Sequence, residues 1–120
     1  KVEAGETEEE AARREVKEEI GVDVPTLALV GRLTFRFPHE PKFDQLVYVY
    51  LAEAWEGEPA ESEEMRPKWF DVAEVPYREM WPDDQFWLPF TIAGEKVVAS
   101  FVFGEGDVVN EQHVETVEEL

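Results

Sequence analysis

The amino-acid sequence predicts one α+β domain over residues 1–120, and three observations support this prediction. A charged segment near the N-terminus has the start, the apolar spacing and the stop of an amphipathic helix. Several short segments rich in β-branched and aromatic residues follow it, most of them bounded by Pro or Gly. Two such segments flank a Gly-rich turn near the C-terminus, which favours a β-hairpin. The 120 residues, 43% of them hydrophobic, suffice for one core and are too few for two ordinary domains.

The first helix is predicted over residues 8–20. Thr7 and Glu10 have the spacing of a capping box, in which each side chain accepts a hydrogen bond from a backbone amide at the helix start. Neither Gly nor Pro interrupts the segment before Gly21, which provides the C-terminal stop. One apolar stripe, suited to packing on a sheet, comes from residues four apart: Ala12, Val16 and Ile20.

The remaining elements are placed by their turn residues. Extended structure is predicted over residues 26–30, 32–37, 43–54 and 68–72, and a hairpin over residues 96–103 and 108–117. A second helix begins at Pro82, which suits a first helical turn, and ends at about Ile92 before Gly94. Two helices and five or six strands, without repeats or a linker, give the α+β class.

The composition limits the classes of partner and site. With 29 acidic and 11 basic residues the net charge is −18, which argues against a general nucleic-acid-binding protein. A phosphorylated substrate would also be repelled unless metal cations lay between protein and phosphate. The absence of cysteine excludes disulfides, Cys-based zinc sites and thiol nucleophiles. No segment reaches the roughly 18 apolar residues of a membrane helix, so we expect a soluble, cytoplasmic protein without a membrane partner.

The carboxylates of the first helix are its most informative residues. At about 100° per residue, three of them share one helix face: Glu15, Glu18 and Glu19. Adjacent carboxylates repel one another, and a hard divalent cation such as Mg²⁺ or Mn²⁺ relieves that repulsion. Arg14, four residues before Glu18, is placed to pair with one of them. The alternative is a solvated acidic face, the usual interpretation of a Glu-rich helix.

A longer pattern decides between these alternatives. Residues 6–22 resemble the Nudix box, which is written Glu-x7-Arg-Glu-aliphatic-x-Glu-Glu-x-Gly-aliphatic and here runs from Glu6 to Val22. The resemblance implies the Nudix fold, a mixed β-sheet packed between helices as an α/β/α sandwich. It also implies an enzyme that hydrolyses a nucleoside diphosphate linked to another group, with Mg²⁺, or alternatively Mn²⁺, as cofactor.

The same resemblance assigns roles to individual residues. It makes Glu15, Glu18 and Glu19 the catalytic metal ligands, with Glu19 the most central, and gives Arg14 and Glu6 an orienting or supporting role. Glu64 is a further candidate ligand or base, with a solvated loop carboxylate as the alternative.

The Nudix box normally opens with a Gly, which here would stand one residue before Lys1, and one or two strands precede it in Nudix domains. We therefore expect that an upstream segment ends in Gly and that N-terminal strands are missing from this chain. An uncovered sheet edge would favour pairing of two copies, so the expected state is a monomer or a homodimer.

A second group of residues narrows the substrate. Asp83 and Asp84 lie at a predicted helix start beside Trp81, so hydrogen-bonding groups adjoin a flat stacking surface. Two close carboxyl groups tend to share a proton, because one raises the pKa of the other. Together they donate and accept, which matches a purine edge carrying N–H and C=O. Alternatively, the helix dipole alone favours acidic residues in a first turn.

These residues and the Met65-Arg66-Pro67 segment resemble the oxidised purine nucleoside triphosphatases of the MutT-homologue type, in matching order over nearly the whole chain. The resemblance implies hydrolysis of substrates such as 8-oxo-dGTP to the monophosphate and pyrophosphate, which cleans the nucleotide pool and prevents DNA damage. Its substrate-binding residues would be Trp81, Asp83 and Asp84, together with Phe35, Phe37 and Phe103. Core packing is the alternative for the three Phe residues, and is favoured for Trp69, Phe70 and Trp87.

Other functions remain as alternatives. A Nudix hydrolase of another specificity would act on ADP-ribose or a dinucleotide. A Nudix-like binding module without catalysis would usually have lost a central Glu, whereas all three stand here. An acidic interaction domain would bind Mg²⁺ only weakly.

Overall fold

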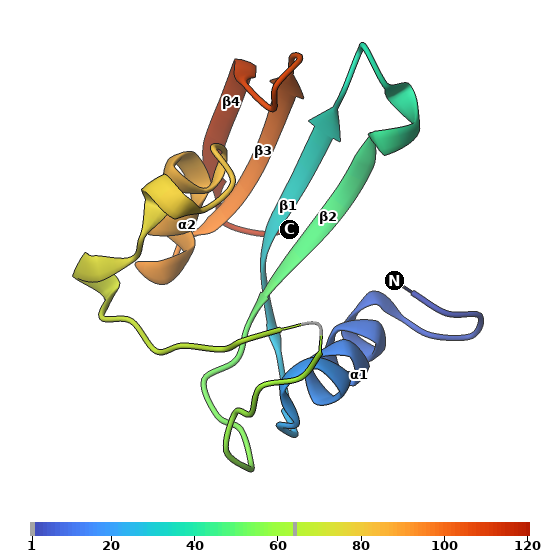
Figure 1. Ribbon diagram of the computed structural model, residues 1–120, viewed down its shortest axis with the longest axis vertical. Helices are drawn as coiled ribbons and strands as arrows, with labels where there is room; N and C mark the ends of the chain where they lie inside the picture. Colours follow the sequence, from blue (N-terminus) through green and yellow to red (C-terminus); the bar gives the residue numbers. More distant parts are fainter. Residues whose placement is uncertain (1, 64) are drawn as a thin grey trace. The chain divides into compact units, whose positions relative to one another are not determined.

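The computed structural model describes residues 2–63 and 65–120, which form two compact units. One unit comprises Lys1–Ala28 and Tyr50–Phe70, and the other comprises Leu29–Val49 and Asp71–Leu120. Helix α1 (Glu8–Ile20) belongs to the first unit, and helix α2 (Asp84–Ile92) to the second (Figure 1). No helix in these described residues is long and apolar enough to cross a membrane.

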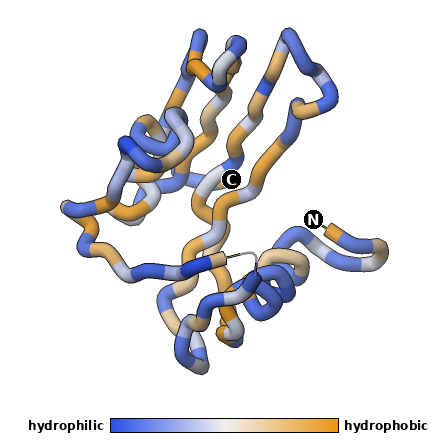
Figure 2. The backbone as a smooth tube through the Cα atoms, viewed as in Figure 1, coloured by the Kyte–Doolittle hydropathy of each residue, from blue (hydrophilic) through white to orange (hydrophobic). Residues whose placement is uncertain are grey.

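Helix α1 has the predicted boundaries because its ends satisfy the backbone groups that a helix leaves unpaired. The Thr7 hydroxyl accepts a hydrogen bond from the Glu10 amide at 3.1 Å, and the Glu10 carboxylate accepts one from the Thr7 amide at 2.9 Å. Gly21 ends the helix in the left-handed conformation (φ 77°), and its amide donates to the Lys17 carbonyl. Figure 2 shows that most of α1 is hydrophilic.

The rest of the first unit is irregular. Asp23 and Glu56 exchange two backbone hydrogen bonds, of 2.9 and 2.8 Å, as an isolated bridge. The predicted strand over residues 68–72 is wrong, because residues 65–71 form no strand and a 3₁₀ helix, η2 (Val72–Glu74), follows. Trp69 is 69% exposed and lies beside Trp55, with ring centroids 5.2 Å apart. The core packing expected of Trp69 is therefore also wrong, and Phe70 is likewise exposed.

The second unit is built on a four-stranded sheet in the order β2-β1-β3-β4. Its strands are β1 (Ala28–Arg36), β2 (Gln45–Leu51), β3 (Lys96–Phe103) and β4 (Val109–Val117). Strands β1 and β3 are parallel, whereas β3 and β4 form the predicted antiparallel hairpin. The mixed sheet of the predicted α+β fold is thus confirmed, with four strands in the described residues where five or six were predicted.

Two strand boundaries differ from the prediction, the first because of residues distant in the sequence and the second because of a local turn. Gly31 does not interrupt β1; a Cβ there would lie 3.1 Å from the Val49 Cβ and 3.3 Å from a Val97 methyl, so Gly permits a close approach. Strand β2 begins later than predicted, after a 3₁₀ helix, η1 (Pro41–Phe43). The Asp44 carboxylate accepts a hydrogen bond from the Phe37 amide at 2.7 Å, which closes this turn.

The core lies on one face of the sheet, because buried side chains alternate along β3. The fully buried cluster is Leu33, Val97, Ala99, Phe101 and Phe103. Helix α2 packs over β3 and β4 and adds Phe86 and Trp87 to this cluster. It begins two residues later than predicted, since Pro82 lies in the preceding turn, and it ends at Ile92 as predicted.

Two leucines on neighbouring strands test this description of the core. Leu33 is 1% exposed and Leu46 is 51% exposed. We expect Leu33→Ala to lower the free energy of unfolding by about 2–5 kcal/mol, because it leaves a cavity in the core. Leu46→Ala should lower it by less than about 1 kcal/mol. Urea denaturation of both variants measures the difference, and equal losses would contradict the assigned core.

Candidate active site

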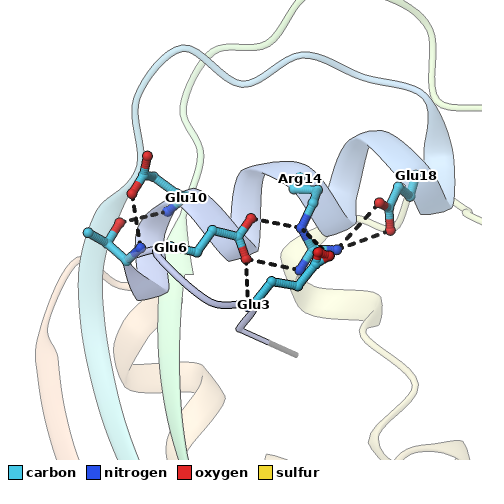
Figure 3. A network of polar contacts seen from close by, with 6 residues as sticks. Glu3, Glu6, Glu10, Arg14 and Glu18 are labelled. Atoms are coloured by element: carbon cyan, nitrogen blue, oxygen red, sulfur yellow. Dashed lines mark hydrogen bonds and ion pairs between the residues drawn. The ribbon is translucent and has the colours of Figure 1, made fainter.

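Arg14 lies at the centre of a network of carboxylates on and before α1 (Figure 3). Its Nε and Nη2 atoms donate to the two carboxylate oxygens of Glu6 at 2.8 and 3.1 Å, a bidentate arrangement. Its Nη1 atom donates to Glu18 at 3.3–3.4 Å, which confirms the predicted pair. The Glu3 carboxylate lies 3.8 Å from Nε.

These contacts fix the charge state of the network. The hydrogen bonds from Arg14, followed by the one from the Glu3 amide, hold the pKa of Glu6 below its ordinary value. The hydrogen bond to Glu6 in turn raises the pKa of Arg14. Glu6 therefore stays ionised at neutral pH, and the Arg14 guanidinium is held in one orientation beside Glu18.

The predicted metal ligands offer oxygen atoms only, the donor type that Mg²⁺ and Mn²⁺ prefer. Glu15 and Glu19 are half-buried on α1, and Glu18 is exposed. Within residues 2–63 and 65–120, no three carboxylate or imidazole side chains converge into a closed metal site. The donor set still fits Mg²⁺, which usually keeps water and substrate phosphates among its ligands. Glu64, the further candidate, lies outside the described residues.

The second unit contains a cavity of about 240 Å³ with mostly apolar walls. Three strands and the segment leading into α2 contribute its lining: Leu33, Phe35, Phe37, Gln45, Val47, Val49, Trp81, Asp83, Asp84, Trp87 and Phe103. All six residues predicted to bind substrate are among them. The structure therefore brings together side chains that are widely separated in the sequence.

Aromatic rings make up much of the wall. The rings of Phe37 and Phe103 stack with centroids 5.1 Å apart and an interplanar angle of 11°. Phe35 lies 6.0 Å from Phe103, and Trp81 meets Phe103 edge-on at 6.0 Å. Trp81 is 56% exposed, so much of its indole remains open to a ligand. A flat aromatic ligand would find stacking surfaces here.

The carboxyl group of Asp83 is the buried polar group of the cavity. Asp83 is 4% exposed, and its Oδ2 atom accepts a hydrogen bond from Trp87 Nε1 at 2.8 Å. In the described part of the chain, its side chain caps no backbone amide of α2, although Asp83 is the N-cap residue. Helix capping therefore does not explain this residue.

Asp84 is perturbed by the same environment. Burial, followed by the charge of Asp83 and a hydrogen bond with it, raises the pKa of Asp84 to about 6, while a hydrogen bond from Trp87 acts in the opposite direction. This confirms the expected rise in the pKa of one member of the pair. At pH values up to about 6, where Asp84 is largely protonated, the two carboxyl groups can together donate and accept hydrogen bonds.

Some lining residues were not predicted from the sequence. Trp87 was assigned to the core, and it packs there, but it also lines the cavity and donates to Asp83. Gln45, Val47 and Val49 were not singled out at all. Their spacing of two along β2 indicates a common face, yet nothing local in the sequence shows that this face meets a cavity.

The titration of Asp84 is directly measurable. We expect its carboxyl ¹³C resonance to titrate with a pKa of about 6, against about 3.9 for an ordinary Asp. Asp83→Asn removes the neighbouring negative charge and should lower this pKa, while burial keeps it above the ordinary value. An Asp84 titration near 3.9 in the unsubstituted protein would contradict the described coupling.

Stability should follow the same titration. Because folding raises the pKa of Asp84, its contribution to stability is complete below about pH 3.9 and is lost as the pH rises through about 6. Asp84→Asn abolishes this titration. The free energy of unfolding of Asp84→Asn, relative to the unsubstituted protein, should therefore increase between about pH 4 and pH 7. Urea denaturation at the two pH values tests this, and a constant difference would refute it.

Comparison with known proteins relates both groups of residues to a family. The family model described as NUDIX domain matches residues 1–90. The oxidized purine nucleoside triphosphate hydrolase of Danio rerio is 43% identical over 120 residues, which are 100% of this chain and 76% of that protein. The enzyme of the same name from Mus musculus is 40% identical over 109 residues, 91% of this chain and 69% of that protein.

A solved structure agrees with these sequence matches. The crystal structure of the mutator MutT protein from Bacillus halodurans superposes with a TM-score of 0.83 at 23% identity, covering 95% of this chain and 77% of that one. The predicted Nudix fold is thereby confirmed. From its family match and its relatives, the chain belongs to the NUDIX domain family, whose motif it carries on α1.

Proposed function

We propose that this protein is a Mg²⁺-dependent hydrolase of oxidised purine (deoxy)nucleoside triphosphates such as 8-oxo-dGTP, releasing the monophosphate and pyrophosphate. The observation that carries the proposal is the pair Asp83 and Asp84 beside Trp81 in an aromatic cavity, with the pKa of Asp84 raised to about 6. The names of the relatives from Danio rerio and Mus musculus support the same substrate class.

The cavity would bind the base. Asp83, fixed by Trp87, accepts a hydrogen bond from a ring N–H, and Asp84 in its protonated form donates to a neighbouring C=O. The N1–H and C6=O groups of guanine present this pattern. The exposed face of Trp81 stacks on the ring, and the apolar walls exclude water, which strengthens these polar contacts.

The carboxylates of α1 would serve the phosphate chemistry. Glu15, Glu18 and Glu19 are the proposed ligands, and Arg14 orients Glu18. Mg²⁺ bound there would neutralise phosphate oxygens and polarise a water for attack on phosphorus. Addition of water breaks the bond between the α- and β-phosphates. With a net charge of −18, the protein depends on such cations to bind a polyphosphate.

The proposed role is removal of damaged nucleotides before DNA synthesis incorporates them. The partner is then a small nucleotide rather than a nucleic acid, the location is cytoplasmic, and the working state is a monomer or homodimer. The high negative charge supports a small nucleotide as the partner, because it disfavours binding to a nucleic-acid backbone.

A hydrolysis assay tests the proposal. The protein is incubated with Mg²⁺ and a panel of normal and oxidised nucleoside triphosphates, ADP-ribose and a dinucleotide, and chromatography identifies the products. We expect monophosphate and pyrophosphate, formed fastest from an oxidised purine. Glu19→Gln should reduce kcat by roughly 100-fold or more, because a metal ligand is weakened.

The matched control is Glu8→Gln, which removes a carboxylate at the other end of α1 and should leave kcat unchanged. Equal turnover in Glu19→Gln and Glu8→Gln would remove Glu19 from the mechanism. Hydrolysis of ADP-ribose or the dinucleotide in preference to every triphosphate would replace the proposed substrate.

Base recognition gives a separate prediction. Asp83→Asn or Asp84→Asn should lower kcat/KM for oxidised purine substrates by roughly tenfold or more relative to pyrimidine triphosphates, because a hydrogen bond to the base is lost in an apolar cavity. Steady-state kinetics on 8-oxo-dGTP and dCTP measure this ratio. An equal loss on both substrates would show that the two residues only maintain the structure.

A further inference from the structure

Gln45 approaches the cavity from the strand farthest from α2. It is the first residue of β2, and the alternate residues Gln45, Val47 and Val49 all line the cavity. The sheet order β2-β1-β3-β4 puts β2 at one edge, whereas α2 packs over β3 and β4. Gln45 therefore enters from the β2 side of the cavity, and Asp83 and Asp84 enter from the segment that begins α2.

The side-chain amide of Gln45 is available to a ligand. Among the residues that the structure describes, no side chain or backbone group hydrogen-bonds to this amide. The other polar groups lining the described cavity are the carboxyl groups of Asp83 and Asp84 and two indole N–H groups, of which that of Trp87 is engaged by Asp83. Gln45 is exposed and lines the cavity, so its amide is free to turn both its donor and its acceptor toward a bound ring.

The carboxyl pair alone does not explain selection of an oxidised guanine. The N1–H and C6=O groups that the pair would bind are identical in guanine and 8-oxoguanine. The two bases differ at the other end of the ring system, where oxidation replaces C8–H by C8=O and adds a hydrogen to N7. A group that recognises both changes offers a donor to the oxygen and an acceptor to N7–H. A primary amide carries both on one carbon atom.

We propose that Gln45 is the residue that selects 8-oxopurines, its amide nitrogen donating to C8=O and its amide oxygen accepting from N7–H. This inference rests on the proposed function, since it names the residue that recognises the second edge of the same base. An unmodified purine offers only the N7 acceptor and would keep one of the two hydrogen bonds. Since one neutral hydrogen bond is worth about a factor of ten or less, Gln45 should contribute up to about tenfold in selectivity.

The experiment compares kcat/KM for three substrates: 8-oxo-dGTP, dGTP and 2-hydroxy-dATP, an oxidised purine with an unaltered C8. Gln45→Met keeps the length of the side chain and removes both its donor and its acceptor. We expect the ratio of 8-oxo-dGTP to dGTP to fall about tenfold in this variant. The ratio of 2-hydroxy-dATP to dGTP should stay unchanged, since neither substrate carries an oxygen on C8.

Two further variants complete the test. Gln112→Met makes the same substitution at an exposed position on β4, away from the cavity, and should leave every ratio unchanged. Gln45→Glu is isosteric and loses the donor to C8=O, so it should reproduce the loss for 8-oxo-dGTP even where Gln45→Met folds poorly.

The outcomes separate the two proposals. An unsubstituted protein that hydrolyses no purine triphosphate overturns the proposed function and the role of Gln45 with it. If the unsubstituted protein prefers 8-oxo-dGTP and the Gln45 variants keep that preference, only the role of Gln45 is overturned. Equal losses on all three substrates would show that Gln45 merely maintains the cavity, and would also overturn it.

Discussion

The buried hydrogen bond between Trp87 Nε1 and Asp83 is the contact on which the candidate base-binding cavity depends. A carboxylate at 4% exposure requires a donor, and α2 supplies one because Trp87 lies four residues after Asp83, on the same helix face. The bond fixes the indole against the core and holds the beginning of α2 in place. It also keeps one negative charge beside Asp84, which contributes to that residue's raised pKa. The hydrogen bond and the packing of Trp87 therefore both follow from the burial of Asp83, which also contributes to the raised pKa of Asp84.

The carboxylates of α1 lie on an accessible surface, and ion pairs rather than burial hold them in place. An isolated ion pair in such a place contributes little, since water screens it and ordering two long side chains is unfavourable. Arg14 contacts Glu3, Glu6 and Glu18 at once, so one ordered side chain serves several partners. The helix thus keeps a high density of negative charge close to its own counter-charge.

The features predicted correctly from the sequence are those that local residues determine. Thr7, Glu10 and Gly21 bound α1 through contacts within a few residues, and the β3–β4 hairpin turns at a local Gly-rich segment. The predictions from the sequence were wrong where contacts between residues far apart in the sequence determine the structure. Gly31 looks like a break in the sequence, but its neighbours on two other strands make it an interior position of β1. The segment around Trp69 has the composition of a strand and lacks a partner to pair with.

The residues of the candidate site show the same difference between local and distant determinants. A contiguous motif and the resemblance that it carries predicted the cavity residues Trp81, Asp83 and Asp84. The β2 residues that complete the lining, Gln45 among them, share no motif with those three. Their position follows from the order of the strands and from which face of β2 is turned toward the sheet's core side, and neither is encoded within the segment itself.

The parallel pairing of β1 with β3 also determines when the cavity forms during synthesis and folding of the chain. These strands are neighbours in the sheet, yet β2, the whole irregular segment and α2 separate them along the chain. During synthesis, β1 and β2 leave the ribosome long before β3, so their apolar side chains are exposed until the C-terminal hairpin arrives. Non-local pairing of this kind is slow because a long loop must close first. The nascent chain therefore passes through an interval in which Phe35 and Phe37 have no Phe103 to stack on, and in that interval it depends on its charge to stay dispersed.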